Sequence, residues 1–147
     1  MGESTIIYSV MNIVLWIGMV WNGILDLWKK RISLIPVIIM LLTGISIRIW
    51  QGEIGEPWVW YGFLPGIICL LLSVLSKGEI GIGDGWMILG MGALIDYELL
   101  FGACIFGMLL AAVVAGILFI GFHKNRKYSI PFVPFLVAGY ICGRCLL

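Results

Sequence analysis

A bundle of six transmembrane helices is the all-α fold class that this sequence predicts. Of its 147 residues, 62% are hydrophobic and 12% are charged, against about 25% charged residues in soluble domains. The mean hydropathy is +1.12, and a soluble core of this size could not bury so much apolar surface. A single transmembrane domain over residues 1–147 is therefore expected, with the lipid bilayer as its partner. The net charge of only +1 argues against nucleic acid as a partner.

Each expected helix is an apolar run that could cross the hydrocarbon core, which takes about 20 residues. In chain order, the runs cover residues 5–25, 32–50, 58–75, 85–95, 99–122 and 130–146. The first run lacks a basic segment before it and a small-residue cleavage site after it, so no cleavable signal peptide is expected.

The fourth run, residues 85–95, is short for a full crossing. Either its helix extends through the preceding glycine-rich stretch, or it begins inside a water-filled recess, where non-helical backbone is tolerated at membrane depth. Asp84 lies at the start of this run, and Asp26 lies at the end of the first run. A charged side chain at membrane depth is costly, so both aspartates are candidate functional residues.

Basic residues gather in three of the short loops: residues 29–31 after the first run, Lys77 after the third, and residues 124–127 after the fifth. Loops on the cytoplasmic side of a membrane carry an excess of Lys and Arg. We therefore expect a multi-pass protein of the cytoplasmic membrane, with these loops in the cytoplasm and both termini outside. Asp26 and Asp84 then lie on the same, cytoplasmic side.

Two carboxyl groups in a low-dielectric recess cannot easily both ionise, so they would share one proton. The ionised group can take a proton from an attacking water, while the protonated group donates to the oxyanion or the leaving nitrogen. Asp26 and Asp84 are therefore candidate catalytic residues of an aspartic endopeptidase. Each also has a plainer interpretation: Asp26 could pair with Lys29 or Lys30 one turn away, and Asp84 could cap a helix.

Glycines flank Asp84 at positions 81, 83 and 85. Glycine permits positive φ and the close approach of another backbone, so Gly81, Gly83 and Gly85 are candidate substrate-binding or backbone-shaping residues. Cys142 and Cys145 have C-x-x-C spacing but no matching second pair. The cysteines are interpreted as small apolar helix residues, and no cofactor and no metal are expected.

Three segments of the chain form a pattern: DLWKKRIS at residues 26–33, GIGD at 81–84 and IPFVPFLVAG at 130–139. Together they resemble the prepilin peptidase family, the G-x-G-D aspartic proteases of bacterial inner membranes, and their archaeal preflagellin relatives. The first segment is similar to the family's aspartate followed, six and seven positions later, by Ile or Leu and by Pro or Ser. The third resembles the family's last-helix signature, I-P-F-x-P-F-L-x-x-G. The resemblance covers nearly the whole chain.

The resemblance implies a type IV prepilin leader peptidase with Asp26 and Asp84 as catalytic residues. Its substrate would be a prepilin-like membrane protein, cut after a glycine that ends a short basic leader, at the cytoplasmic face. Three features depart from the family. Leu34 stands where Asn or Asp is usual, Trp86 stands where Lys is frequent, and the cysteine-rich insertion of many members is absent from the chain. The resemblance therefore does not extend to N-methylation of the product.

Two other functions stay open at this point. One is an intramembrane protease with another single-span substrate. The other is a non-enzymatic small transporter or channel that uses Asp26 and Asp84 as ion sites. The expected position of both acids near the membrane edge argues against transport, because transporter sites usually lie near the midplane.

Overall fold

The computed structural model describes residues 2–76, 81–122 and 131–146, and within these ranges all regular secondary structure is helical, with no strand. This confirms the all-α class. The helices are α1 (Gly2–Lys29), α2 (Leu34–Trp50), α3 (Pro57–Tyr61), α4 (Leu64–Leu75), α5 (Ile82–Leu94), α6 (Tyr97–Phe122) and α7 (Val133–Leu146), with a 3₁₀ turn, η1 (Glu53–Gly55), between α2 and α3. The residues His123, Lys77, Glu79 and 124–127 lie outside the described ranges.

A helix lies at the position of each predicted run, with two differences in detail. The third run is divided into α3 and α4, because Pro65 lacks the N–H that would bond to the carbonyl of Tyr61 and continue the helix. The fourth helix begins at Ile82, three residues before the predicted start, so the GIGD segment forms its first turn.

Three of these helical segments are long and apolar enough to cross a membrane: Glu3–Lys29, Pro57–Leu75 and Tyr97–Leu118. The shorter apolar helices are Leu34–Trp50, Ile82–Leu94 and Val133–Cys145. Each of the shorter helices has fewer than the about 20 residues that an unaided crossing needs. Six crossings therefore stay a prediction.

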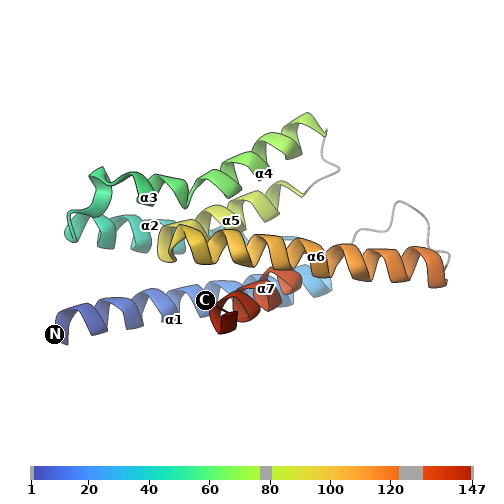
Figure 1. The fold of residues 1–147 in the computed structure, drawn as a ribbon, viewed down its shortest axis with the longest axis horizontal. Helices are drawn as coiled ribbons and strands as arrows, with labels where there is room; N and C mark the ends of the chain where they lie inside the picture. Colours follow the sequence, from blue (N-terminus) through green and yellow to red (C-terminus); the bar gives the residue numbers. More distant parts are fainter. Residues whose placement is uncertain (1, 77–80, 123–130, 147) are drawn as a thin grey trace.

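Successive long segments run in alternating directions along the bundle (Figure 1). The ends of α1, α4 and α6 lie towards one end of the molecule, as do the starts of α5 and α7. The amino terminus, the turn from α2 to α3 and the junction of α5 with α6 lie towards the other. The second half of α6 projects beyond the other helices. We call the end that holds the start of α5 the aspartate end.

Close packing between helices depends on small residues. Gly139 of α7 faces the backbone of Ala103 and Gly107 on α6, so these two helices touch closely. In the same way Gly66 of α4 faces the backbone of Leu89, so α4 lies directly against α5. Helix α5 is the most enclosed element, with eight of its 13 residues buried.

The core between the helices is rich in methionine. Met19, Met40, Met87 and Met91 are fully buried together with Tyr140. Met side chains adapt their shape to irregular gaps between helices. The outer faces expose many large apolar side chains instead, as lipid-facing helices do.

Candidate active site

Asp26 lies in the last turn of α1 and is almost fully buried, with 6% of its surface exposed. Its Oδ2 accepts a hydrogen bond from the backbone N–H of Val133 at 3.0 Å, and the backbone of Phe132 is a second hydrogen-bond partner. Lys30 lies within electrostatic range. The proximity to Lys30 fits the plainer interpretation in part, but the hydrogen bonds of the carboxylate go to the start of α7.

The first turn of α7 has a backbone N–H group that needs a hydrogen-bond acceptor from outside the helix. Val133 is the first residue of the helix, and the first N–H groups of a helix have no partner within it. Pro134 follows and has no N–H to satisfy. An acidic group at a helix start also interacts favourably with the helix dipole. Asp26, which belongs to α1, therefore caps the amino end of α7. This contact joins two of the three sequence segments, residues 26–33 and 130–139.

Asp84 is the third residue of α5 and is half-buried. Its N–H donates to the carbonyl of Gly81 at 3.1 Å, which closes the first turn. Its carboxyl lies within electrostatic range of Asp26. The structure thus brings together, at the aspartate end, the two acids that the sequence singled out.

The three predicted glycines are needed for close packing. A side chain at Gly81 would come within 2.9 Å of Oδ2 of Asp84, so its absence leaves room for the carboxylate. A Cβ at Gly83 would lie 2.9 Å from the side chain of Ile32. None of the three has a positive φ, and Gly52 is the one glycine with that conformation in the described ranges. Their small size therefore matters, and the backbone freedom expected from the sequence is not used.

Gly85 is the most tightly packed of the three. A Cβ there would lie 2.7 Å from Cγ of Leu70 and 3.0 Å from the Leu70 backbone nitrogen. Leu70 belongs to α4, so Gly85 fixes the contact of α4 with α5 immediately beside Asp84. The glycines therefore shape the backbone around the site. Substrate contact by them stays a prediction.

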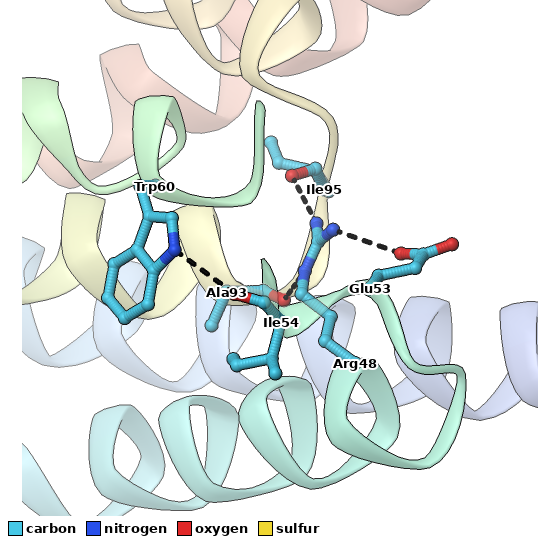
Figure 2. Close-up of polar contacts among 6 residues, drawn as sticks. All are labelled: Arg48, Glu53, Ile54, Trp60, Ala93 and Ile95. Carbon is cyan, nitrogen blue, oxygen red and sulfur yellow. Dashed lines mark hydrogen bonds and ion pairs between the residues drawn. The ribbon is translucent and has the colours of Figure 1, made fainter. Parts of the chain in front are cut away.

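Arg48 is a buried charge whose role the sequence analysis missed. It lies on α2 at the other end of the bundle, where its Nε donates to the carbonyl of Ala93 at 3.1 Å and its Nη2 to that of Ile95 at 3.2 Å (Figure 2). Its Nη1 pairs with Oε2 of Glu53 at 3.5 Å. Arg48 thus caps the carboxyl end of α5. The signal in the sequence was an arginine inside the apolar run of residues 32–50.

A cavity of about 290 Å³ lies beside Arg48. Its walls mix both signs of charge, since Arg48 and Arg144 face it together with Glu53 and Asp96. Arg144 is already engaged, because its Nη1 donates to Asn12 Oδ1 at 3.0 Å and to the Tyr140 hydroxyl at 2.8 Å. This cavity is remote from the two aspartates, because Leu94 and Ile95 at the carboxyl end of α5 line it, whereas Asp84 lies in the first turn of α5.

Metal ligands do not cluster in the described part of the chain: no three His, Cys, Asp or Glu side chains there could hold an ion together. Cys142 and Cys145 are exposed and free on the last turns of α7. Cys69 and Cys104, which are also free, lie inside the bundle.

The chain matches no protein-family model, and comparisons with curated proteins and with solved structures found no match. Function therefore has to be inferred from the residues themselves. The arrangement at the aspartate end provides one buried carboxylate bonded to the backbone, one half-buried carboxylate within electrostatic range of it, and three glycines beside the second carboxylate. Such a pair can take a proton from a water and lend one to a leaving group.

Proposed function

We propose that this chain is a membrane aspartic endopeptidase of the prepilin peptidase type, with Asp26 and Asp84 as its catalytic pair. One observation carries the proposal. Two acids that lie 58 positions apart in the sequence come within electrostatic range at one end of the bundle, and the first of them is bonded to the start of α7. All three segments of the family resemblance contribute to this one place.

The environments of the two carboxyls suit a division of labour. Asp26 is held by backbone N–H groups, so its orientation is fixed before substrate arrives. Asp84 is half-buried in the first turn of α5. A water between them would lose its proton to one carboxyl and attack the scissile carbonyl carbon. The other carboxyl would protonate the leaving nitrogen. Preorganisation of this kind is a main source of catalytic rate.

We further propose that all six helical segments cross the membrane, with the aspartate end in the cytoplasm. The alternation of helix direction in Figure 1 supports this arrangement. The shortest crossing element, α5, is enclosed by its neighbours, and short or irregular backbone is tolerated where protein surrounds it. The exposed basic residues 29–31 belong to the aspartate end, as the excess of positive charge on the cytoplasmic side requires.

The proposed substrate is a single-span protein of the prepilin class, with a short basic leader before its apolar helix. A site at the end of the bundle suits a bond at the edge of the membrane, where leader and helix meet. A site for ion transport would more often lie near the midplane. The substrate class comes from the resemblance, and the position of the aspartates supports it.

Cleavage in membranes tests the proposal. A prepilin-like protein with a basic leader is incubated with membranes that contain the wild type, Asp26→Asn or Asp84→Asn, and the loss of the leader is followed by the shift in mass. Wild type is expected to cleave, and each Asn variant should lose activity by at least about 100-fold, because Asn keeps the shape of Asp but cannot exchange the proton. Asp96→Asn is the matched control, since Asp96 is exposed at the opposite end.

The outcomes separate the possible functions. Near wild-type cleavage by either Asn variant would refute the catalytic pair. If the folded wild type cleaves no prepilin-like protein but cleaves another single-span protein, the chain is an intramembrane protease of different specificity. If it cleaves neither, and ion flux into vesicles depends on Asp26 and Asp84, the transport function would replace the proposal.

A further inference from the structure

Asn22 is a fully buried polar residue two turns before the end of the apolar helix α1, with 0% of its surface exposed. It lies four positions before Asp26, so the two side chains share one face of the helix. A polar group at membrane depth is costly unless it is hydrogen-bonded. The contacts of Asn22 explain why this position holds a polar residue.

The first contact joins α1 to the start of α2. Oδ1 of Asn22 accepts the backbone N–H of Ser33 at 2.8 Å. Ser33 is the residue before α2, and its own side chain forms no capping bond to that helix within the described residues. The connection between the helices turns at Lys30, which has a positive φ of 48°, an uncommon conformation for a residue other than glycine. Asn22 therefore ties this folded-back connection to α1.

The second contact joins α1 to α5. Nδ2 of Asn22 lies 3.6 Å from Sδ of Met87 as a hydrogen-bond donor. Met87 stands three positions after Asp84, one turn along α5. The Asn22–Met87 contact thus lies one turn further into the bundle than the two aspartates, and it joins the same two helices.

The Ser33 contact also leads to α5. Ser33 is preceded by Ile32, whose side chain is so close to Gly83 that a Cβ at Gly83 would lie 2.9 Å away. Gly83 is the neighbour of Asp84. Asn22 therefore reaches the first two turns of α5 by two routes: directly at Met87 in the second turn, and through Ser33 and Ile32 to Gly83 in the first.

From these contacts we infer that Asn22 is a positioning residue for the aspartate pair: it sets the placement of Asp84 on α5 relative to Asp26 on α1. This inference rests on the proposed function for its catalytic meaning, but its structural content can be measured without any substrate. Asn22 does not touch the reacting atoms. A displacement of about 1 Å of a catalytic group can reduce a rate by about 100-fold, so a side chain that holds the spacing matters for the rate.

The test uses the full chain in detergent micelles or nanodiscs and three variants. Asn22→Leu removes both contacts at similar volume. Asn22→Asp keeps an oxygen acceptor for Ser33 and removes the donor to Met87. Asn12→Leu is the matched control, because Asn12 is also an asparagine of α1 with side-chain hydrogen bonds, to Tyr8 and Arg144 at the other end.

Two NMR signals are measured in each variant. The first is amide hydrogen exchange at Ser33 and at residues 82–85, and the second is the ¹³C carboxyl shift of Asp26 and of Asp84.

In Asn22→Leu, we expect amide exchange at Ser33 to be about tenfold faster, as the loss of one hydrogen bond implies. Amide exchange in the first turn of α5 should also be faster, and the carboxyl shifts of both aspartates should change. Asn22→Asp should keep the protection of Ser33. Asn12→Leu should change none of these signals. In the cleavage assay, kcat per folded molecule should fall by about 10-fold to 100-fold in Asn22→Leu, with little change in KM.

Unchanged exchange in the first turn of α5 and unchanged carboxyl shifts in Asn22→Leu would overturn the inference, whatever the cleavage assay gives. A uniform rise in exchange over all helices would also overturn it, because it would mean general destabilisation. If Asn22→Leu does not fold, Asn22→Ser, which is smaller and polar, is measured by the same signals with the same two criteria. If the wild type cleaves nothing while the NMR changes occur as expected, the proposed function fails and the positioning role stands.

Discussion

The carboxylate of Asp26 accepts the backbone N–H of Val133 at 3.0 Å, across 107 positions of sequence. This bond joins the end of α1 to the start of α7. The same carboxylate lies within electrostatic range of Asp84. Asp26 therefore has two separable roles, one in holding α7 and one in the proposed chemistry.

Substitutions of Asp26 should separate these roles. Asp26→Ala leaves the buried N–H of Val133 without an acceptor, which should cost about 1–3 kcal/mol of unfolding free energy. Asp26→Asn retains an acceptor oxygen and should cost clearly less. Both variants should be inactive in cleavage. Thermal unfolding in detergent, measured beside the cleavage assay, checks the prediction, and equal stability of the two variants would contradict the capping role.

The helices were largely predictable from sequence, because each is an apolar run of helical length. The break between α3 and α4 was missed, although its cause, Pro65, stands in the sequence. For a helix, the missing N–H of a single proline outweighs the continuous apolar character of the run.

The candidate site was predictable in part. The distribution of basic loops predicted that Asp26 and Asp84 lie on the same side, and the structure has them within electrostatic range of each other; the side of the membrane stays a prediction. The bond from Asp26 to Val133 was not predictable, because hydrophobic patterns do not say which helix faces which. Asn22 and Arg48 were visible as polar residues within apolar runs, but only the structure gives their partners.

The packing beside Asp84 leads to a second prediction. An alanine Cβ at position 85 would lie 3.0 Å from the backbone nitrogen of Leu70, and a helix backbone cannot move as easily as a side chain. Gly85→Ala should therefore destabilise the protein by about 1–3 kcal/mol and lower cleavage, because α5 is displaced. Chemical or thermal unfolding and the cleavage rate are measured.

Gly116→Ala is the matched control for Gly85→Ala. It also changes a glycine within a helix, but no atom of the described residues lies within 4 Å of a Cβ built there. Ala is the better helix former by about 1 kcal/mol, so this variant should be neutral or slightly more stable. Similar losses of stability for both variants would argue against the close contact of α4 with α5.

A third prediction concerns Arg48, which holds the carboxyl end of α5. Arg48→Met should lower the unfolding free energy by about 1–3 kcal/mol, since it leaves the carbonyls of Ala93 and Ile95 without their donor. Glu53→Gln should cost at most about 1 kcal/mol, because the Glu53 side chain is 37% exposed and such pairs contribute little. Folded Arg48→Met protein should still cleave, since the residue is remote from the aspartates. Loss of cleavage at unchanged stability would contradict a purely structural role of Arg48.

The orientation in the membrane can be tested with single cysteines in a chain whose native cysteines are replaced. A cysteine at Gly55, which is exposed between α2 and α3, should react with a membrane-impermeant maleimide in intact cells. A cysteine at Lys29 should react only after the membrane is opened. The reverse pattern would put the aspartates outside the cell, where the leader of a prepilin-like protein does not reach them.

The last prediction concerns the double variant Asp26→Asn with Asp84→Asn. Two carboxyls that share one proton act as a unit, so the loss of either should remove nearly all of the catalysis that depends on the pair. The double variant should then cleave no more slowly than the slower single variant, within about threefold, when rates are measured in the same membranes at equal amounts of folded protein. If the effects on ln(kcat/KM) instead add, the two aspartates contribute independently, and a shared proton between them would be refuted. Additivity is the usual result for distant, uncoupled sites, so this comparison tests directly whether the closeness of Asp26 and Asp84 has a chemical consequence.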